Sequence, residues 1–293
     1  MPVALKYVRR FNRQTLGPGL RAAPGTVGYL GDESALTVYN VGDPLPAGCS
    51  WDGQAFRIDA DGFVLERFLI RAEVVSYGRN PTLRQGIVET SSGATFGVTV
   101  NGQDRGTLTI EDVTVRRATP ATAGDVQTNG VSSDSALIAR RCDVSGSGDG
   151  IHVVAGGGSL ISQCVLHDLA FVDEAQHLDG IQVFSGAGGA ITVEHCWVGP
   201  ILSAQGTPPN SSLTCGFATN SGPIITPTIV DNFFASGLYH LRIGYRVAGA
   251  VVTGNDLGQL LPGEFGLSSV TEPSSIATWS NNRDGSGELI PQP

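Results

Sequence analysis

The sequence predicts an all-β fold, a single-stranded parallel β-helix (solenoid). Three observations predict it: a short apolar pattern recurs along most of the chain, glycine makes up 40 of 293 residues, and only 15% of residues are charged. Glycine at about twice its usual share suits tight turns between short strands, and the shortage of charge disfavours long solvated helices. Because one repeat continues through the chain, we expect one solenoid and not two globular domains.

The repeat reads apolar-x-x-[Cys, Asn or apolar]-x-apolar. Its middle residues are 45, 29, 22, 32, 36, 23 and 27 residues apart, which places insertions in the turns and leaves the strands intact. Strands this short cannot bury a face alone, but coil on coil they form parallel sheets with rows about 4.8 Å apart. The middle residues are Phe68, Val113, Cys142, Cys164, Cys196, Asn232, Asn255 and, in a degraded last copy, Asn282.

The Cys and Asn residues of this repeat form one column. We interpret the column as inward-turning corners, filled first by small buried thiols and then by amides that hydrogen-bond along the stack. None of the five cysteines belongs to a CxxC pair, so the sequence contains neither a zinc-ribbon motif nor a CxxC redox motif. We therefore expect reduced, structural thiols.

A second short strand precedes most copies of the repeat and usually opens with glycine. Because side chains alternate across a strand, the residue after the apolar position should point outward. The predicted outward row is Val88, Ser132, His152, Gln182, Ala218, Arg242 and Ser268. The residues before the strand are Asn129, Asp149, Asp179, Cys215, Tyr239 and Phe265.

The repeat over about residues 55–285 resembles the right-handed parallel β-helix of the pectate-lyase-like superfamily. That superfamily includes polysaccharide lyases, glycoside hydrolases and many phage tailspikes. The segment from His177 to Gln182 is similar to one found in actinobacterial and phage β-helix proteins. The resemblance implies a groove along one flank in which a polysaccharide lies.

Polar side chains on that flank supply candidates for catalysis and binding. If Asp149 and Asp179 stack one coil apart, they approach the roughly 5–5.5 Å separation of retaining glycosidase carboxylates. Alternatively, the carboxylates bind Ca²⁺ and neutralise a uronate while a histidine or Arg242 takes the α-proton in a β-elimination. The catalytic candidates are Asp149, His152, His177 and Asp179, and the substrate-binding candidates are Gln182, Tyr239, Arg242, Asp173 and Glu174.

Plainer roles explain several of these residues as well. Asp-Gly before a strand is a common turn signal, so Asp149 and Asp179 can serve as turn caps. His167 and His195 fall beside corner positions and are interpreted as structural. Tyr239 and Arg242 can form a carbohydrate-binding surface without chemistry. The run of clustered Asp ligands typical of calcium-dependent pectate lyases is missing from this sequence, which counts against the lyase mechanism.

The sequence divides into residues 1–54, 55–285 and 286–293. We expect the first to cap the stack or attach it to a partner, the second to be the β-helix, and the third to be a tail. A net charge of −9 argues against a nucleic-acid partner. No stretch approaches the roughly 20 apolar residues of a membrane span, and residues 1–20 lack the apolar core of a signal peptide.

We therefore expect a tail-associated phage protein, made in the host cytoplasm and located in the virion, that binds a host cell-surface polysaccharide, with or without cleaving it. Other virion tail proteins are expected partners, and a homotrimer is a further expectation from the resemblance. The alternatives are a stand-alone lyase or glycoside hydrolase, secreted without a signal peptide, and a purely structural virion protein. The sequence leaves open whether the chain is an enzyme.

Overall fold

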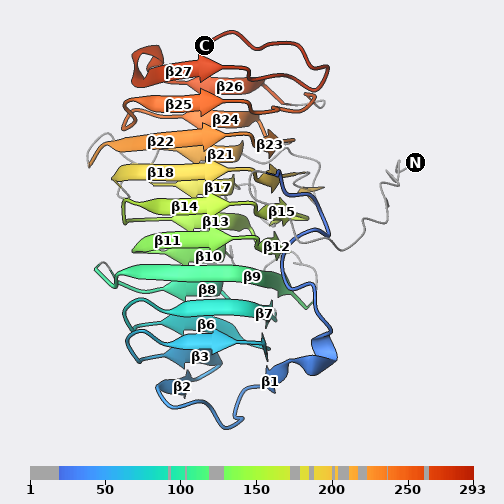
Figure 1. The fold of residues 1–293 in the computed structure, drawn as a ribbon, viewed down its shortest axis with the longest axis vertical. Coiled ribbons are helices and arrows are strands. Elements are labelled where there is room, and N and C mark those ends of the chain that lie inside the picture. Colours follow the sequence, from blue (N-terminus) through green and yellow to red (C-terminus); the bar gives the residue numbers. More distant parts are fainter. Residues whose placement is uncertain are drawn as a thin grey trace.

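The chain is a stack of short parallel strands, which confirms the predicted all-β solenoid (Figure 1). The computed structural model describes residues 20–91, 94–102, 104–118, 129–171, 179–184, 188–199, 202–203, 211–216, 223–235, 237–260 and 264–293. Within these ranges the helices are two three-residue 3-10 turns, η1 (Glu33–Ala35) and η2 (Pro273–Ser275). In the described part of the chain, stacked coils of short strands make up the body of the molecule.

Two sheets run along the stack, and each coil contributes to both. In the ten-stranded sheet only the first pair, β2 and β3, is antiparallel. Its strands are β2 (Cys49–Asp52), β3 (Ala55–Ile58), β6 (Glu73–Ser76), β8 (Phe96–Val100), β10 (Asn129–Ser133), β13 (Asp149–Val153), β17 (Asp179–Val183), β21 (Ser211–Cys215), β24 (Tyr239–Ile243) and β26 (Gly266–Val270).

The fifteen-stranded sheet usually takes two strands from each coil, a longer one and then a short one after a sharp corner. A further pair, β16 (Ala170–Phe171) and β20 (Leu202–Ser203), stands apart. The fifteen strands are β1 (Thr37–Tyr39), β4 (Val64–Glu66), β5 (Phe68–Ile70), β7 (Thr82–Thr90), β9 (Thr107–Arg117), β11 (Ala136–Arg140), β12 (Asp143–Ser145), β14 (Ser159–Ser162), β15 (Val165–His167), β18 (Gly189–Glu194), β19 (Trp197–Val198), β22 (Ile225–Val230), β23 (Phe233–Phe234), β25 (Ala250–Thr253) and β27 (Ile276–Ser280).

The core is a set of apolar columns inside the stack. Ile151 pairs in register with Ile181 of the next coil, and Leu213 and Leu241 continue the column. All four side chains are at most 1% exposed. Since each side chain packs on its equivalent in the coils above and below, the same few apolar positions suffice for every coil.

One residue in the left-handed region makes the corner of each coil. Arg141, for example, has φ 51° and Asp231 has φ 53°. A non-glycine residue pays roughly 1–2 kcal/mol for this conformation, so the surrounding contacts must hold it there. The corner residues with positive φ are Arg67, Gln85, Asp112, Arg141, Gln163, His195, Asp231, Gly254 and Asn281.

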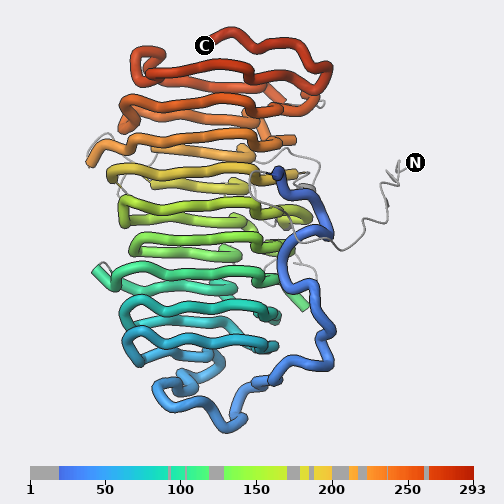
Figure 2. Tube along the Cα trace, viewed as in Figure 1, coloured from blue at the N-terminus to red at the C-terminus, as the bar shows by residue number. Residues whose placement is uncertain are grey.

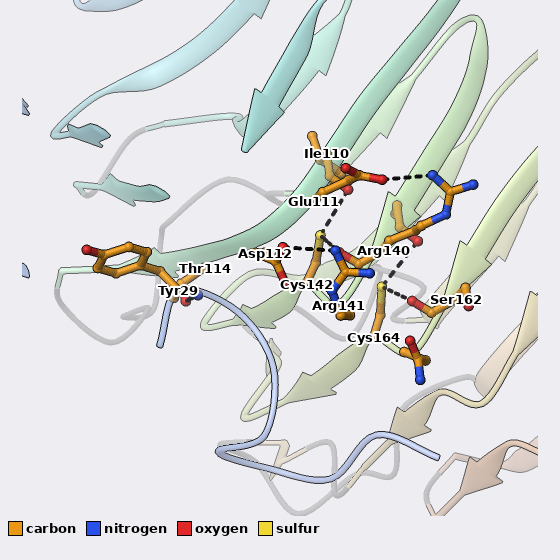
Figure 3. A network of polar contacts seen from close by, with 12 residues as sticks. Tyr29, Ile110, Glu111, Asp112, Thr114, Arg140, Arg141, Cys142, Ser162 and Cys164 are labelled. Atoms are coloured by element: carbon orange, nitrogen blue, oxygen red, sulfur yellow. Dashed lines mark hydrogen bonds and ion pairs between the residues drawn. The ribbon is translucent and has the colours of Figure 1, made fainter. Parts of the chain in front are cut away.

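The residue after each left-handed residue points into the core, as the sequence predicted for the cysteines. Cys142, Cys164 and Cys196 are 0% exposed and carry free thiols. The Cys142 thiol donates to the carbonyl of Ile110 in the preceding coil at 3.5 Å (Figure 3). Burial raises the pKa of the Cys142 and Cys196 thiols, which keeps them protonated and able to donate.

Asparagines take over this corner in the later coils and make the ladder predicted from the sequence. Asn255 Nδ2 donates to the Ile229 carbonyl at 2.9 Å, the same kind of acceptor that the thiols use. Its Oδ1 also accepts from the backbone N–H of Asn232 at 3.0 Å. Asn232 and Asn282 repeat the pattern. Each amide therefore joins two coils through both of its polar atoms.

One coil lies where the sequence-based repeat left a gap. The spacing of 45 between Phe68 and Val113 contains two coils, because Gly86 pairs with Val113 in β7 and β9. Gly86 does not match the sequence repeat, which requires Cys, Asn or an apolar residue at the corner. The Phe68 ring occupies the space for a side chain there, since a Cβ at Gly86 would lie 2.6 Å from that ring. The prediction that Gly86 opens a strand of the second type, with Val88 pointing outward, is therefore wrong.

Two other strands of that type are also displaced from their predicted positions. β21 begins at Ser211 and ends at Cys215, so the strand of this coil ends before Gly216, where the sequence predicted that it begins; Ala218 lies outside the described residues. Gly266 pairs with Tyr239, and Ser269, not Ser268, pairs with Arg242. At the register of Gly130, Gly150 and Gly180 these two coils have Ser212 and Leu267, so the glycine signal is lost there.

Residues 20–39, which we call the strap, lie along the outside of the stack (Figures 1 and 2). The strap hydrogen-bonds to backbone carbonyls of the left-handed corner residues. Gly28 N donates to Arg141 O and Ala22 N to His195 O, each at 2.8 Å. Arg21 Nε donates to Asp231 O at 2.8 Å, and Thr37 N to Arg67 O at 2.9 Å. The strap thus spans the coils from β5 to β22.

The strap also buries apolar side chains on the outer face of the short strands. Leu36 packs against Leu69 and Ile87. Ala22 and Val27 pack against Val165. Gly28 crosses so close that a Cβ would lie 2.5 Å from Thr114 Oγ1. Residues 20–54 therefore include a segment that lies lengthwise on the coils and the strand β2, whose hairpin partner β3 begins at Ala55.

Replacing Asn255 with alanine should lower the free energy of unfolding by about 2–3 kcal/mol, because Asn232 N–H and Ile229 C=O lose buried partners. Asn255→Cys should lose less, since a thiol in this column donates to the same kind of carbonyl. Urea denaturation of both variants measures the difference. Equal losses in the two variants would contradict the assigned role of the amide.

Replacing Gly28 with alanine should destabilise the protein more than replacing Gly25. Both glycines have φ near +80°, but a Cβ at Gly25 meets nothing within 4 Å, whereas one at Gly28 meets Thr114 and Asp143. The left-handed cost of roughly 1 kcal/mol is common to both, so the excess in Gly28→Ala reports strap packing. The measurement is the denaturant midpoint of each variant, and equal midpoints would argue against a closely packed strap.

Candidate functional site

The flank, as we use the term, is the edge where each coil turns into the next strand of the ten-stranded sheet. Two rows of side chains follow this edge in register. The first row is Asn129, Asp149, Asp179, Ser211 and Tyr239. The second row is Ser132, His152, Gln182, Thr214 and Arg242. The structure therefore brings most of the described candidate residues onto one edge, with Arg242 two coils from Gln182.

Asp149 and Asp179 stack in successive coils, but both are buried. Their exposed fractions are 2% and 0%. Asp149 Oδ1 accepts from the backbone N–H of Asp179 at 2.9 Å. Asp179 Oδ1 accepts from the Thr214 hydroxyl at 2.9 Å and from the Ser211 hydroxyl. Both carboxylates thus join neighbouring coils, and this geometry favours the turn-capping role over contact with a polymer.

His152 lies in the second row with a half-buried, neutral ring. Asn129 Nδ2 lies 3.0 Å from His152 Nδ1, and the Phe184 ring packs against the imidazole at 4.7 Å between centroids. Burial lowers the pKa of His152 to about 4, although Asp134 opposes the shift. With Nδ1 accepting from the amide, the ring proton is on Nε2, which has no hydrogen-bond partner within the described residues. The ring nitrogen that could act as a base, Nδ1, already accepts a hydrogen bond, so the side chain is not arranged as a base.

His177, Asp173 and Glu174 lie outside the described residues. Gln182 is half-buried between His152 and Thr214 in the second row. Over the described ranges, no group of three or more His, Cys, Asp or Glu side chains is placed to hold a metal ion. The same ranges contain no helix that is long and apolar enough to cross a membrane.

An exposed aromatic cluster occupies the C-terminal part of the flank. Tyr239 and Phe265 pack edge to face with their centroids 6.0 Å apart. The Arg242 guanidinium carbon lies 5.9 Å from the centroid of the Tyr239 ring. Phe265 is 71% exposed, a large fraction for a phenylalanine in a formed cluster. Tyr239 and Arg242 were expected here, whereas Phe265 had been identified only as a turn position.

A hollow of about 460 Å³ adjoins this cluster along the chain. Leu267, two residues after Phe265, is one of its lining residues, together with Leu260 and Gln259. Asp284 and Ser286 of the last coil also line it. We call Tyr239, Arg242 and Phe265 the aromatic cluster. The cluster offers ring faces and a guanidinium near the C-terminal end of the flank.

Two buried residues next to the cluster, His240 and Glu264, were not among the site residues predicted from the sequence. His240 and Glu264 have side chains that are 0% and 1% exposed, and His240 Nε2 lies 3.1 Å from Glu264 Oε2. The signal for His240 was its place in a row that other coils fill with Gly130, Gly150 and Gly180. Glu264 carries no periodic signal, because it lies in a turn.

His167 is held between two carboxylates away from these rows, in agreement with its structural interpretation. Its Nε2 lies 2.9 Å from Asp143 Oδ1, and its Nδ1 lies 2.7 Å from Asp168 Oδ2. Burial disfavours the charged ring, but the hydrogen bonds to Asp143 and Asp168 outweigh it and raise the pKa of His167 to about 10. The hydrogen bond from His167 in turn lowers the pKa of Asp168.

His167 should make stability depend on pH in the alkaline range. Its folded pKa of about 10 exceeds the ordinary value of 6.5, so its contribution is complete below pH 6.5 and is lost as pH rises to 10. The difference in unfolding free energy between the wild type and His167→Asn should fall by about 3 kcal/mol across this window. Urea unfolding at several pH values measures it, and a difference that is constant with pH would refute the charged ring.

Comparison of the chain with models of known families, with curated proteins and with solved structures finds no match.

Proposed function

We propose that this chain is a β-helix that binds a host cell-surface polysaccharide through the C-terminal part of its flank. The observation that carries the proposal is the aromatic cluster, in which a largely exposed Phe265 stands against Tyr239 beside a guanidinium. Leaving such a ring in water is unfavourable unless it contacts a partner. The ring faces can stack on the apolar faces of sugars, and Arg242 can donate to hydroxyl or carboxylate oxygens.

The rigid support of the cluster favours binding of a repetitive polymer. Tyr239 and Arg242 lie on β24, which is paired on both sides by parallel strands. Rows at about 4.8 Å intervals along the flank repeat the same kinds of position from coil to coil. A long chain laid along the stack axis can therefore meet several coils with little loss of protein entropy.

These side chains support binding of the polysaccharide and not its cleavage. The two stacked aspartates are buried and hydrogen-bonded to neighbouring coils, and His152 Nδ1 already accepts a hydrogen bond from Asn129. We propose that the protein acts as a tail-associated virion protein in this binding role. The five free cysteines, four of them buried, fit a protein that folds in a reducing compartment.

Replacing Phe265 with alanine should weaken polysaccharide binding about tenfold, the effect of losing one central aromatic contact. Isothermal titration calorimetry against purified capsular and cell-wall glycans measures the affinity. Val64→Ala is the matched control, because Val64 is 50% exposed on the other sheet. Equal affinity in Phe265→Ala and the wild type would refute the cluster as the binding surface, and release of new reducing ends or unsaturated uronates would refute the non-catalytic role.

A further inference from the structure

His240 occupies a position where neighbouring coils have no room for a side chain. A Cβ at Gly130, Gly150 or Gly180 would lie 2.3 Å from a core side chain of the short strand in the same coil. In the coil of β24, this position instead holds a fully buried imidazole. The ring reaches the matching short-strand residue of its own coil, since Nδ1 contacts the carbonyl of Leu257. The packing of this coil therefore differs from that of the coils of β10, β13 and β17, because it accommodates the His240 side chain.

Hydrogen-bond chemistry fixes how His240 and Glu264 interact. The Leu257 carbonyl can only accept, so His240 Nδ1 carries a proton. Nε2 faces Glu264 Oε2 at 3.1 Å, and one proton between these two atoms satisfies both. Glu264 Oε1 accepts from the backbone N–H of Gly237 at 3.2 Å. The carboxyl group thus ties its own segment to two residues of the neighbouring coil.

Phe265 directly follows Glu264, so this tie determines where the exposed ring stands. The backbone N–H groups of Phe265 and Gly266 both donate to Leu238 O, at 2.7 and 3.1 Å. The backbone around Phe265 is held by these bonds on one side and by Glu264 on the other. The ring then stands 6.0 Å from Tyr239 in the aromatic cluster.

We propose that His240 and Glu264 are positioning residues for polysaccharide binding: their buried pair holds Phe265 against Tyr239 so that the cluster presents a fixed aromatic surface to the face of a pyranose ring. This inference rests on the proposed function. A buried polar pair suits the task because its geometry is directional, whereas an apolar contact would let the segment slide. The pair touches no sugar and acts only through Phe265.

The test compares Glu264→Ala with Glu264→Gln. Alanine leaves the buried His240 Nε2 and Gly237 N–H without their partner, whereas the glutamine amide can donate to Nε2 and accept from Gly237 N–H. In Glu264→Ala, hydrogen exchange at the Phe265 and Gly266 amides should accelerate at least about tenfold. Polysaccharide affinity should fall toward that of Phe265→Ala. Glu264→Gln should restore slow exchange and most of the affinity.

Exchange at the core amide of Ile151 serves as the folding control and should stay slow in both variants. Unchanged exchange at Phe265 and Gly266 in Glu264→Ala would overturn the inference. Faster exchange with wild-type affinity would overturn it as well, provided that Phe265→Ala loses binding. If neither Phe265→Ala nor Glu264→Ala affects affinity while exchange accelerates in Glu264→Ala, the proposed function fails and the pair is shown to hold the segment for another purpose.

Discussion

From Cys142 to Asn282, a single buried side chain at the corner of each coil is bonded to a backbone carbonyl of the coil before it, and this is the contact on which that part of the structure depends. The corner requires a left-handed residue, which is unfavourable for every residue except glycine. Stacking offsets the cost, because the next residue buries a thiol or an amide against that carbonyl. Cys142 and Asn255 solve this problem with different chemistry at the same place.

The same corners prepare the surface that receives the strap. A left-handed residue turns its carbonyl away from the sheet ladder, and the carbonyls of Arg141, His195 and Asp231 face outward in a line. The strap uses that line as its row of acceptors. Contacts that hold consecutive coils together therefore also determine where residues 20–39 lie, and the strap links coils that do not touch one another.

On the flank, burial decides which polar groups can meet a ligand. Asp149, Asp179 and His152 share the edge with Tyr239 and Arg242, but the first three are turned into contacts between coils or shielded by neighbours. In the aromatic cluster the Phe265 ring is exposed, whereas the polar pair of His240 and Glu264 is buried. Polar groups therefore have different roles along the axis of the solenoid. In the middle coils they form hydrogen bonds between coils, and near the C-terminal end they lie next to an exposed aromatic ring.

The sequence by itself determined the solenoid, its corner column and the register of β10, β13 and β17. Each coil contacts mainly its neighbours, so the requirement for a small or amide side chain recurs at each corner and is visible as a pattern. Gly86 and the coils of β21 and β26 were misplaced because a neighbour's ring or a lost glycine changed the local signal.

Only the tertiary structure decided the rest. The strap pairs Ala22 with His195, and the buried pair joins His240 to Glu264; neither contact recurs from coil to coil, so no repeat in the sequence could reveal it. The sequence likewise could not predict that Asp149 and Asp179 are buried. An Asp-Gly pair before a strand has the same sequence pattern whether its carboxylate faces water or the next coil. Periodic contacts leave a trace in the sequence, and contacts made once do not.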